Sequence, residues 1–575
     1  MSEIEKNHEN QEQIEQIKQI ERDKTKQKQK RKIGCLNGCL PGLIVLVLFW
    51  WYCVYSPPLR ISPETTYITS PKTSDGKYVD YFLAIEERYY PPEMETDNNG
   101  YRLIVRAFGD LVGRSGQTTD KETGEIKQNI TELLRRQVYE KLGLDPDIKP
   151  TLKIESALTF LNKKEKGEKD VEKKSSVKFS REKDYWTIDE FPELKEWLDA
   201  NNAGIDLIGE AVRKPTFRMP LARVNENVPM IIALDSYHGY NVLREFARAV
   251  RNRADYRIGV GDIDGAIYDV MTLHYLGYHT GKHGTIIGTL MGIAISGVAS
   301  STAIGANPDH PLTKEQLERW AKELNALPPK ITFAETMESE RLYVLALTQD
   351  QYRGILNVST YMITVPNGSN DINIWKVWQW CIDINVMLSE INKKYDSFNA
   401  GNIYKQPLER MTRNPLAYIS VRSRTKQISR GYMNLVVGSV ESVDMALQRS
   451  ECVGNMQLLT LALLMYEKEH GKLPDENWQE AIRPYLGDNP DKLFCCPTSG
   501  LADRASTMYR LTKDDKKFIL TETELQVDDS NSSGSIKMVT AMHNGGANFA
   551  YKNGAVKFIS PRQLQKEFLG NTNGR

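Results

Sequence analysis

The sequence predicts an α+β protein with a single N-terminal transmembrane helix, a largely α-helical middle region with helical hairpins, and a C-terminal long helix packed on a small antiparallel sheet. Three patterns predict this fold class: an uncharged run after a basic tail, apolar residues at helical spacing in the middle of the chain, and an Asn-Gly pair between two short apolar runs near the end. Because 575 residues exceed what one hydrophobic core organises, several domains are expected. The expected divisions are a cytoplasmic basic tail at 1–33, a transmembrane helix at 34–55, a mixed α/β segment at 56–150, a helical region at 151–440 and a C-terminal domain at 441–575.

Composition excludes several classes of protein. The chain has 75 basic and 75 acidic residues, so its charge balance gives no reason to expect a nucleic-acid partner. Seven cysteines in so long a chain exclude a disulfide-framework fold, and no spacing typical of a zinc knuckle or a redox pair occurs among them. No cofactor is predicted.

The membrane anchor is indicated by charge and length together. Ile33 to Tyr55 contains 23 residues without a charge, which is long enough to cross a bilayer as a helix. Aromatic residues gather at its end, where their rings suit the lipid-water interface, and residues 24–32 before it carry six Lys and Arg and no acid. Basic flanks stay in the cytoplasm, so the large C-terminal region is expected outside the cytoplasmic membrane, with residues 34–55 in contact with lipid.

Two alternatives to this topology are weighed. A cleaved signal peptide is disfavoured because the preceding tail exceeds thirty residues and no small-residue cleavage site precedes Ser56, and a lipoprotein anchor is disfavoured because Cys53 follows bulky residues. A second uncharged stretch, Ile286 to Gly305, contains the close-packing motif Gly288-x-x-x-Gly292. Its glycines and its lack of an aromatic belt favour a buried helix over a second span, and both readings stay open.

The middle region is predicted to be helical. Residues 162–184 form a Lys- and Glu-rich stretch that predicts a solvated loop. Apolar residues from Leu243 to Ala254 share one helical face, and the turn Gly259 to Gly265 followed by a second helix to Tyr278 predicts a helical hairpin. Arg244, Arg248 and Arg251 lie on another face of the first helix, which is interpreted as a solvated face. Thr313 with Gln316 predicts a capping box for the helix that Pro328-Pro329 ends.

The C-terminal region combines a long helix with short strands. Cys452, Met456, Leu459, Leu463 and Tyr466 form one apolar stripe, and Gly471 with Pro474 ends the helix. Met508 to Leu511 and Lys517 to Leu520 read as strands. Asn553-Gly554 predicts a two-residue type I′ hairpin in which Tyr551 opposes Val556 and Phe549 opposes Phe558, so that these four side chains share the face that packs on the helix.

Three motifs in this region resemble the bacterial prepilin-like or pseudopilin-like proteins, and the resemblance covers about a quarter of the chain. His543 stands nine residues before Asn553-Gly554, like that family's C-terminal His, nine residues, then Asp-Gly signature. The helix from Arg449 to Pro474 and the loop Phe494-Cys495-Cys496-Pro497 resemble the family's long helix and Cys-Pro loop. Asn replaces the usual Asp, which a type I′ turn accepts, and no pilin leader precedes the helix, so processing and polymerisation are not expected. The segments before it are similar to uncharacterised bacterial envelope proteins.

Catalytic and metal sites are predicted only weakly. His279 and His283 stand four apart, as two ligands on one helical face would, but nearby glycines and the lack of a third ligand favour a polar helix end. The aspartates near Asp262 are better explained by a tight turn than by a calcium loop. His543 is the signature residue, and a structural hydrogen bond is favoured over a catalytic base because no nucleophile is placed beside it. No catalytic residue is therefore assigned.

One disulfide is a candidate between Cys452 and either Cys495 or Cys496. Neighbouring cysteines would form a strained ring, which leaves Cys452 as the better partner, and the alternative is that Cys452 is a buried apolar residue. For function, the expectation is a membrane-anchored extracytoplasmic interaction or scaffolding protein of the bacterial envelope, with an envelope protein or polymer as its partner. The alternative is a membrane-tethered enzyme, for example a hydrolase, with an unrecognised site in the helical region.

Overall fold

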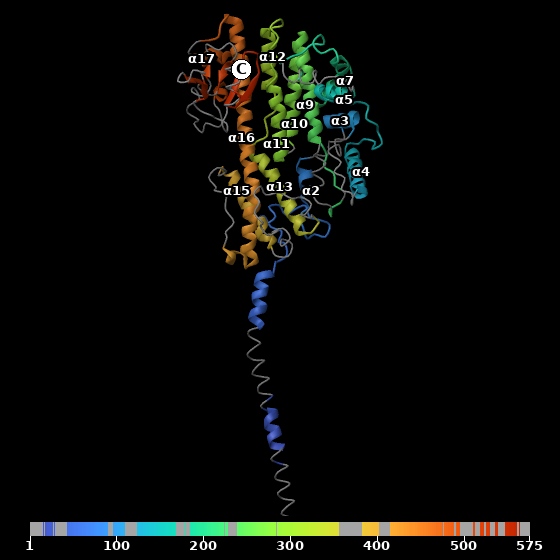
Figure 1. The fold of residues 1–575 in the computed structure, drawn as a ribbon, viewed down its shortest axis with the longest axis vertical. Coiled ribbons are helices and arrows are strands. Elements are labelled where there is room, and N and C mark those ends of the chain that lie inside the picture. The colour runs from blue at the N-terminus through green and yellow to red at the C-terminus, as the bar shows by residue number, and fades with distance from the viewer. Residues whose placement is uncertain are drawn as a thin grey trace, which may run out of the picture. The chain divides into compact units, whose positions relative to one another are not determined.

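The computed structural model is mostly helical, with a small antiparallel sheet near the C-terminus (Figure 1). Contacts divide the chain into two units: unit 1 comprises 1–60, 358–390 and 409–432, and unit 2 comprises 61–357, 391–408 and 433–575. The structure describes residues 15, 18–26, 28, 43–89, 96–109, 124–167, 179, 184–223, 225–227, 239–282, 285–355, 382–401, 414–474, 477–487, 490–494, 510–511, 518–521, 525–528, 535–538, 547–560 and 563.

In unit 1, residues 43–54 are helical and carry the apolar side chains of the expected anchor, while 29–42 lie outside the described residues. Large apolar side chains on this helix are exposed; Leu46, for example, is 66% accessible. Arg424 Nη2 donates to the carbonyl oxygen of Cys53 at 2.8 Å. In the described part of the chain, no helix meets the length and hydropathy needed to cross a membrane.

Unit 2 consists of packed helices and the sheet. Its helices are α2 (Tyr81–Tyr89), α3 (Gly100–Phe108), α4 (Gly124–Lys141), α5 (Ala157–Gly167), α7 (Leu194–Val212), α9 (Gly239–Val260), α10 (Ile263–Gly281), α11 (Ile286–Ser300), α12 (Lys314–Asn325), α13 (Phe333–Tyr352) and α17 (Trp478–Ile482), and α15 (Ile384–Asn399) and α16 (Val421–His470) have residues in both units. Residues 162–167 continue α5, so the predicted charged loop begins in a helix. Among the described residues of 56–150, regular structure comprises α2, α3 and α4 together with isolated bridges at Lys72–Val79 and Asn99–Thr216.

The predicted helical hairpin is formed by α9 and α10, which lie side by side (Figure 1). Gly261 has a φ of +79°, a backbone conformation that glycine adopts without strain. Asp262 then caps α10, because its side chain accepts from the Gly265 nitrogen at 3.0 Å. The arginine face is partly paired: Arg248 contacts Glu245, and Arg251 donates to Asp255 at 2.6 Å.

The second uncharged stretch forms α11, which packs closely on α10. A Cβ on Gly292 would lie 2.6 Å from the Gly281 nitrogen, so the close approach of the two helices requires glycine there. α11 is also in contact with α9 and α13, and Gly288, Gly292 and Ile295 are buried. The Gly288-x-x-x-Gly292 pattern thus serves helix packing within unit 2.

Helix starts follow the predicted capping chemistry. The capping box of Thr313 and Gln316 at the start of α12 is confirmed, and Thr332 with Glu335 forms a second one at α13. α16 ends at His470, and Gly471 has a φ of +73°, as the sequence predicts. α16 begins at Val421, about twenty residues before the expected boundary at 441, because helical residues continue upstream without a break.

The sheet has the strand order β1 (Arg510–Leu511), β2 (Phe518–Thr521), β5 (Ala547–Tyr551), β6 (Val556–Ile559), all antiparallel, and β3 (Leu525–Asp528) pairs separately with β4 (Ser535–Met538). The two strands predicted before the hairpin correspond to β1 and β2. The sequence did not predict β3 and β4.

The predicted register of the β5–β6 hairpin is wrong by one residue. Phe549 opposes Lys557 and Ala550 opposes Val556, and the Tyr551 nitrogen donates to the Ala555 carbonyl oxygen at 2.8 Å. The connection therefore has three residues ending in Gly554, whose φ is +82°, instead of a two-residue type I′ turn.

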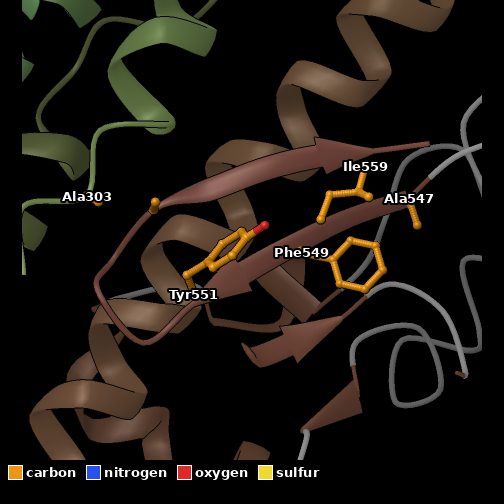
Figure 2. Close-up of a cluster of buried hydrophobic side chains, with 6 residues drawn as sticks. Ala303, Ala547, Phe549, Tyr551 and Ile559 are labelled. Atoms are coloured by element: carbon orange, nitrogen blue, oxygen red, sulfur yellow. The ribbon is translucent and has the colours of Figure 1, made fainter. Parts of the chain in front are cut away.

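This shift exchanges the faces of β6. Phe549 and Tyr551 share a buried cluster with Ala303, Ala547, Ala555 and Ile559, as Figure 2 shows for the labelled side chains. Val556 and Phe558 consequently lie on the opposite face, because successive side chains in a strand alternate. Phe558 stacks beneath Arg449 of α16, with 4.8 Å between the guanidinium carbon and the ring centre.

Substitution of Gly554 should test the observed turn. Gly554→Ala is expected to destabilise unit 2 by about 1–2 kcal/mol, because alanine is strained at positive φ and its Cβ would lie 3.0 Å from the Trp320 ring. Asn553→Asp should be nearly neutral, because the side-chain oxygen that accepts from the Ala555 nitrogen is kept. Urea unfolding of both variants checks this, and equal stability of Gly554→Ala and the parent would contradict it.

Candidate functional site

Unit 2 contains a pocket of about 560 Å³ between α11, α16 and β6, closed on another side by the segment that follows α12. Its volume lies in the range of small-molecule sites. The residues that line it come from five segments and are His274 on α10; Ile293, Ala294, Ser296, Gly297, Ser300 and Ser301 on and after α11; Leu324, Leu327, Pro328 and Lys330; Arg449, Ser450, Glu451, Val453, Gly454, Asn455, Gln457 and Leu458 on α16; and Val556, Lys557 and Phe558 on β6.

An amine enters the pocket from Lys330. The residue as a whole is exposed, but its Nζ is turned inward and donates to the Ser450 carbonyl oxygen at 2.7 Å and lies 3.1 Å from the Ser450 Oγ. Crowding of the ammonium by protein atoms lowers the pKa of Lys330 to about 8, while the nearby Glu451 acts in the opposite direction. The amine is therefore mostly protonated at neutral pH and gains a neutral fraction in mildly alkaline solution.

Two buried polar atoms at the pocket have no hydrogen-bond partner among the residues that the structure describes. They are the Nε2 atoms of His274 and Gln457, whose side chains are 8% and 1% exposed. The Gln457 Oε1 accepts from the Ser300 Oγ at 3.2 Å, so the amide nitrogen is the end left unpaired. Burial lowers the pKa of His274 to about 3, with Lys330 contributing in the same direction, so this imidazole is neutral at physiological pH. Unpaired buried polar atoms are costly and indicate a place for a ligand or water.

Positively charged side chains outnumber negatively charged ones around the pocket. Lys557 is paired with Asp184 at 3.1 Å, and Arg449 lies over the Phe558 ring. Glu451 is the acid among the described lining residues. Lys330 and Arg449 therefore leave a net positive charge at the pocket.

This arrangement permits two kinds of chemistry. Hydrogen-bond donors and cations beside an apolar wall can hold a ligand with acceptor oxygens. Alternatively, the neutral form of Lys330 can accept the proton of Ser450, as in a serine-lysine pair. Ser450 lies inside α16, however, where the surrounding N–H groups are engaged in the helix and cannot stabilise an oxyanion.

The weak metal candidate was the pair His279 and His283, and the contacts of His279 do not support a metal ligand. His279 Nε2 is bonded to the Val212 carbonyl oxygen at 2.8 Å, and the ring stacks on Phe217. Burial lowers the pKa of His279 to about 4. His283 lies outside the described residues, within which no group of three His, Cys, Asp or Glu side chains could hold a metal ion.

The signature residues are only partly described. Asn553 and Gly554 form the hairpin turn, and the Asn553 carbonyl oxygen accepts from the Gly305 nitrogen at 3.0 Å, which ties the turn to the segment after α11. His543 lies outside the described residues. Neither Asn553 nor Gly554 lines the pocket.

Cys452 is disulfide-bonded and fully buried on α16. Cys495 and Cys496 lie outside the described residues, so the pairing with one of them stays a prediction. Non-reducing proteolysis followed by mass spectrometry should yield a peptide that joins Cys452 to the Cys495-Cys496 segment. Recovery of Cys452 joined elsewhere, or alkylated without prior reduction, would contradict it.

The residues of the pocket carry no motif in the sequence. Lys330, Ser450 and Gln457 lie far from His274 along the chain, and only packing brings them together. Two sequence features could have pointed to the pocket. They are the pair Pro328-Pro329 before Lys330 and the polar residues that interrupt the apolar stripe of α16. No family model, no curated protein and no solved structure matches the chain.

Proposed function

We propose that this chain is a membrane-anchored, extracytoplasmic interaction protein of the bacterial envelope whose unit 2 binds its partner through the pocket at α16. The anchor is assigned to residues 34–55, with the N-terminus in the cytoplasm. Support comes from the basic cluster ahead of the uncharged run and from the exposed apolar side chains of residues 43–52.

The pocket is the observation that carries the binding function. It combines an apolar wall with a small number of polar end groups, two of which lack hydrogen-bond partners within the described chain, and this is the usual composition of a binding site. The resemblance of the C-terminal region to prepilin-like proteins favours an envelope protein or polymer as the source of the bound group. The balanced charge of the chain gives no reason to expect a nucleic-acid partner.

A membrane-tethered enzyme is the second candidate, and the contact of Lys330 with Ser450 favours it. A lysine with a lowered pKa beside a hydroxyl is one way to activate a nucleophile. The helical position of Ser450 weighs against it, because no backbone donors remain for the oxyanion. A fluorophosphonate probe distinguishes the two: labelling of Ser450 that is lost in Lys330→Met would favour the hydrolase, and no labelling is expected.

Proteolysis from outside the cytoplasmic membrane tests the anchor. In spheroplasts, added protease is expected to digest the region after Pro58 and to spare a fragment that contains residues 1–55, because the basic flank stays inside. A cytoplasmic marker protein controls for lysis. Protection of unit 2 in intact spheroplasts would overturn the proposed topology.

A further inference from the structure

We propose that the pocket between α11, α16 and β6 takes an amphipathic anion, a molecule with one anionic head group and an apolar body. The inference rests on the proposed binding function and names the chemical class of the ligand. It follows from three features of the pocket: its net positive charge, its unpaired polar atoms and its apolar wall.

The positive charge comes from two side chains that approach from different segments. Arg449 belongs to α16 and Lys330 to the segment after α12, and within the described residues neither forms an ion pair. The third cation, Lys557, is already paired with Asp184 at 3.1 Å. A cation beside an apolar surface is desolvated in part, so an anionic group on a ligand regains interaction energy there.

The unpaired atoms require a ligand with acceptor atoms. The Gln457 amide nitrogen is a donor in a side chain that is 1% exposed, and Lys330 donates into the same pocket. His274, neutral because burial lowers its pKa, adds a polar nitrogen that donates or accepts according to its tautomer. The oxygens of a carboxylate or phosphate accept several such bonds at once, which a hydroxyl or an amide does less well.

The remaining wall accommodates the apolar body. Leu324, Leu327, Val453, Leu458, Val556 and Phe558 line the pocket from α12 and the segment after it, from α16 and from β6. A cationic ligand would meet Arg449 and Lys330, with Glu451 as the one opposing charge among the described lining residues. Like charges in a partly buried site repel, so the head group of the ligand should be negatively charged.

Protection of Lys330 from acetylation tests the proposal at the site itself. The full-length chain in lipid nanodiscs is treated with an amine-acetylating reagent, and modification of each lysine is followed by mass spectrometry. Octanoate is the probe, and octanamide, with the same apolar body and no charge, is its matched control. Octanoate is expected to slow acetylation of Lys330 saturably, at least fivefold, and to leave the exposed Lys322 of α12 unchanged.

Two variants connect the protection to the pocket. Arg449→Gln and Gln457→Leu should each weaken octanoate protection about tenfold, as expected for loss of one charge-assisted or buried hydrogen bond. Lys322→Gln should have no effect, and unfolding curves establish that each variant is folded. Equal protection by octanamide would overturn the anion while leaving the binding function intact. Protection by neither compound would overturn both the anionic ligand and binding at this pocket. The proposed membrane anchor would be unaffected, because the proteolysis experiment tests it separately.

Discussion

Replacement of Asp269 by alanine is expected to destabilise unit 2 by about 3–5 kcal/mol, because it leaves a buried arginine without its main partner. Asp269 on α10 is fully buried, and Arg253 on α9 is 2% exposed. The guanidinium binds the carboxylate through two bonds, Nη2 to Oδ1 at 2.7 Å and Nε to Oδ2 at 3.0 Å. Arg257 adds a third contact at 3.0 Å.

An exposed pair in the same unit supplies the control. Asp199 and Lys195 on α7 are 62% and 61% exposed at their side chains, so Asp199→Ala should leave the stability nearly unchanged. Urea unfolding of the full-length chain, followed by tryptophan fluorescence, compares the two variants with the parent. A change of the unfolding midpoint in Asp269→Ala no larger than in Asp199→Ala would contradict the assignment of this ion pair as a structural element of the α9–α10 hairpin.

Elements whose ends are set by local chemistry were predictable. Thr313 and Gln316 cap α12 through bonds between residues three apart, and Gly471 ends α16 through its own backbone conformation. The α9–α10 hairpin also follows from apolar spacing and a glycine turn. None of these features depends on what lies elsewhere in the chain, so the sequence is sufficient to locate them.

The hairpin register was not predictable in the same way. Asn553-Gly554 is compatible with a two-residue turn and with a three-residue turn whose last residue is glycine. The choice follows from tertiary contacts: the Asn553 carbonyl oxygen binds the Gly305 nitrogen, and Gly554 lies against Trp320. A shift of one residue moves every side chain of β6 to the other face, which is how Phe558 reaches Arg449.

The pocket could not be predicted from the sequence at all. Nothing in the sequence near Lys330 indicates that protein atoms surround its amine in the fold. Its contact with Ser450 joins residues 120 positions apart. Arg253 is a related case, since three other arginines of α9 were assigned to a solvated face and nothing local distinguishes the one that is buried. In each case burial and the pKa are consequences of the fold.

Acidification from pH 7 to pH 5 is expected to destabilise unit 2 through its two buried histidines. Burial lowers the pKa of His274 to about 3 and that of His279 to about 4, whereas an unfolded histidine titrates near 6.5. Between these values the unfolded chain binds protons that the folded chain does not, so stability is complete above about pH 6.5 and decreases as the pH falls. Each histidine should cost about 2 kcal/mol at pH 5, or about 4 kcal/mol together.

Substitution separates this effect from the titration of other groups. His274→Phe removes an unpaired buried nitrogen, and His279→Gln keeps a group that can donate to the Val212 carbonyl oxygen, so both variants should fold at pH 7. The double variant should lose about 4 kcal/mol less than the parent on going to pH 5, whereas His470→Gln, which replaces an exposed histidine, should behave as the parent. Urea unfolding at both pH values measures the difference. An equal loss of stability in the parent and the double variant would show that neither histidine is held neutral by burial.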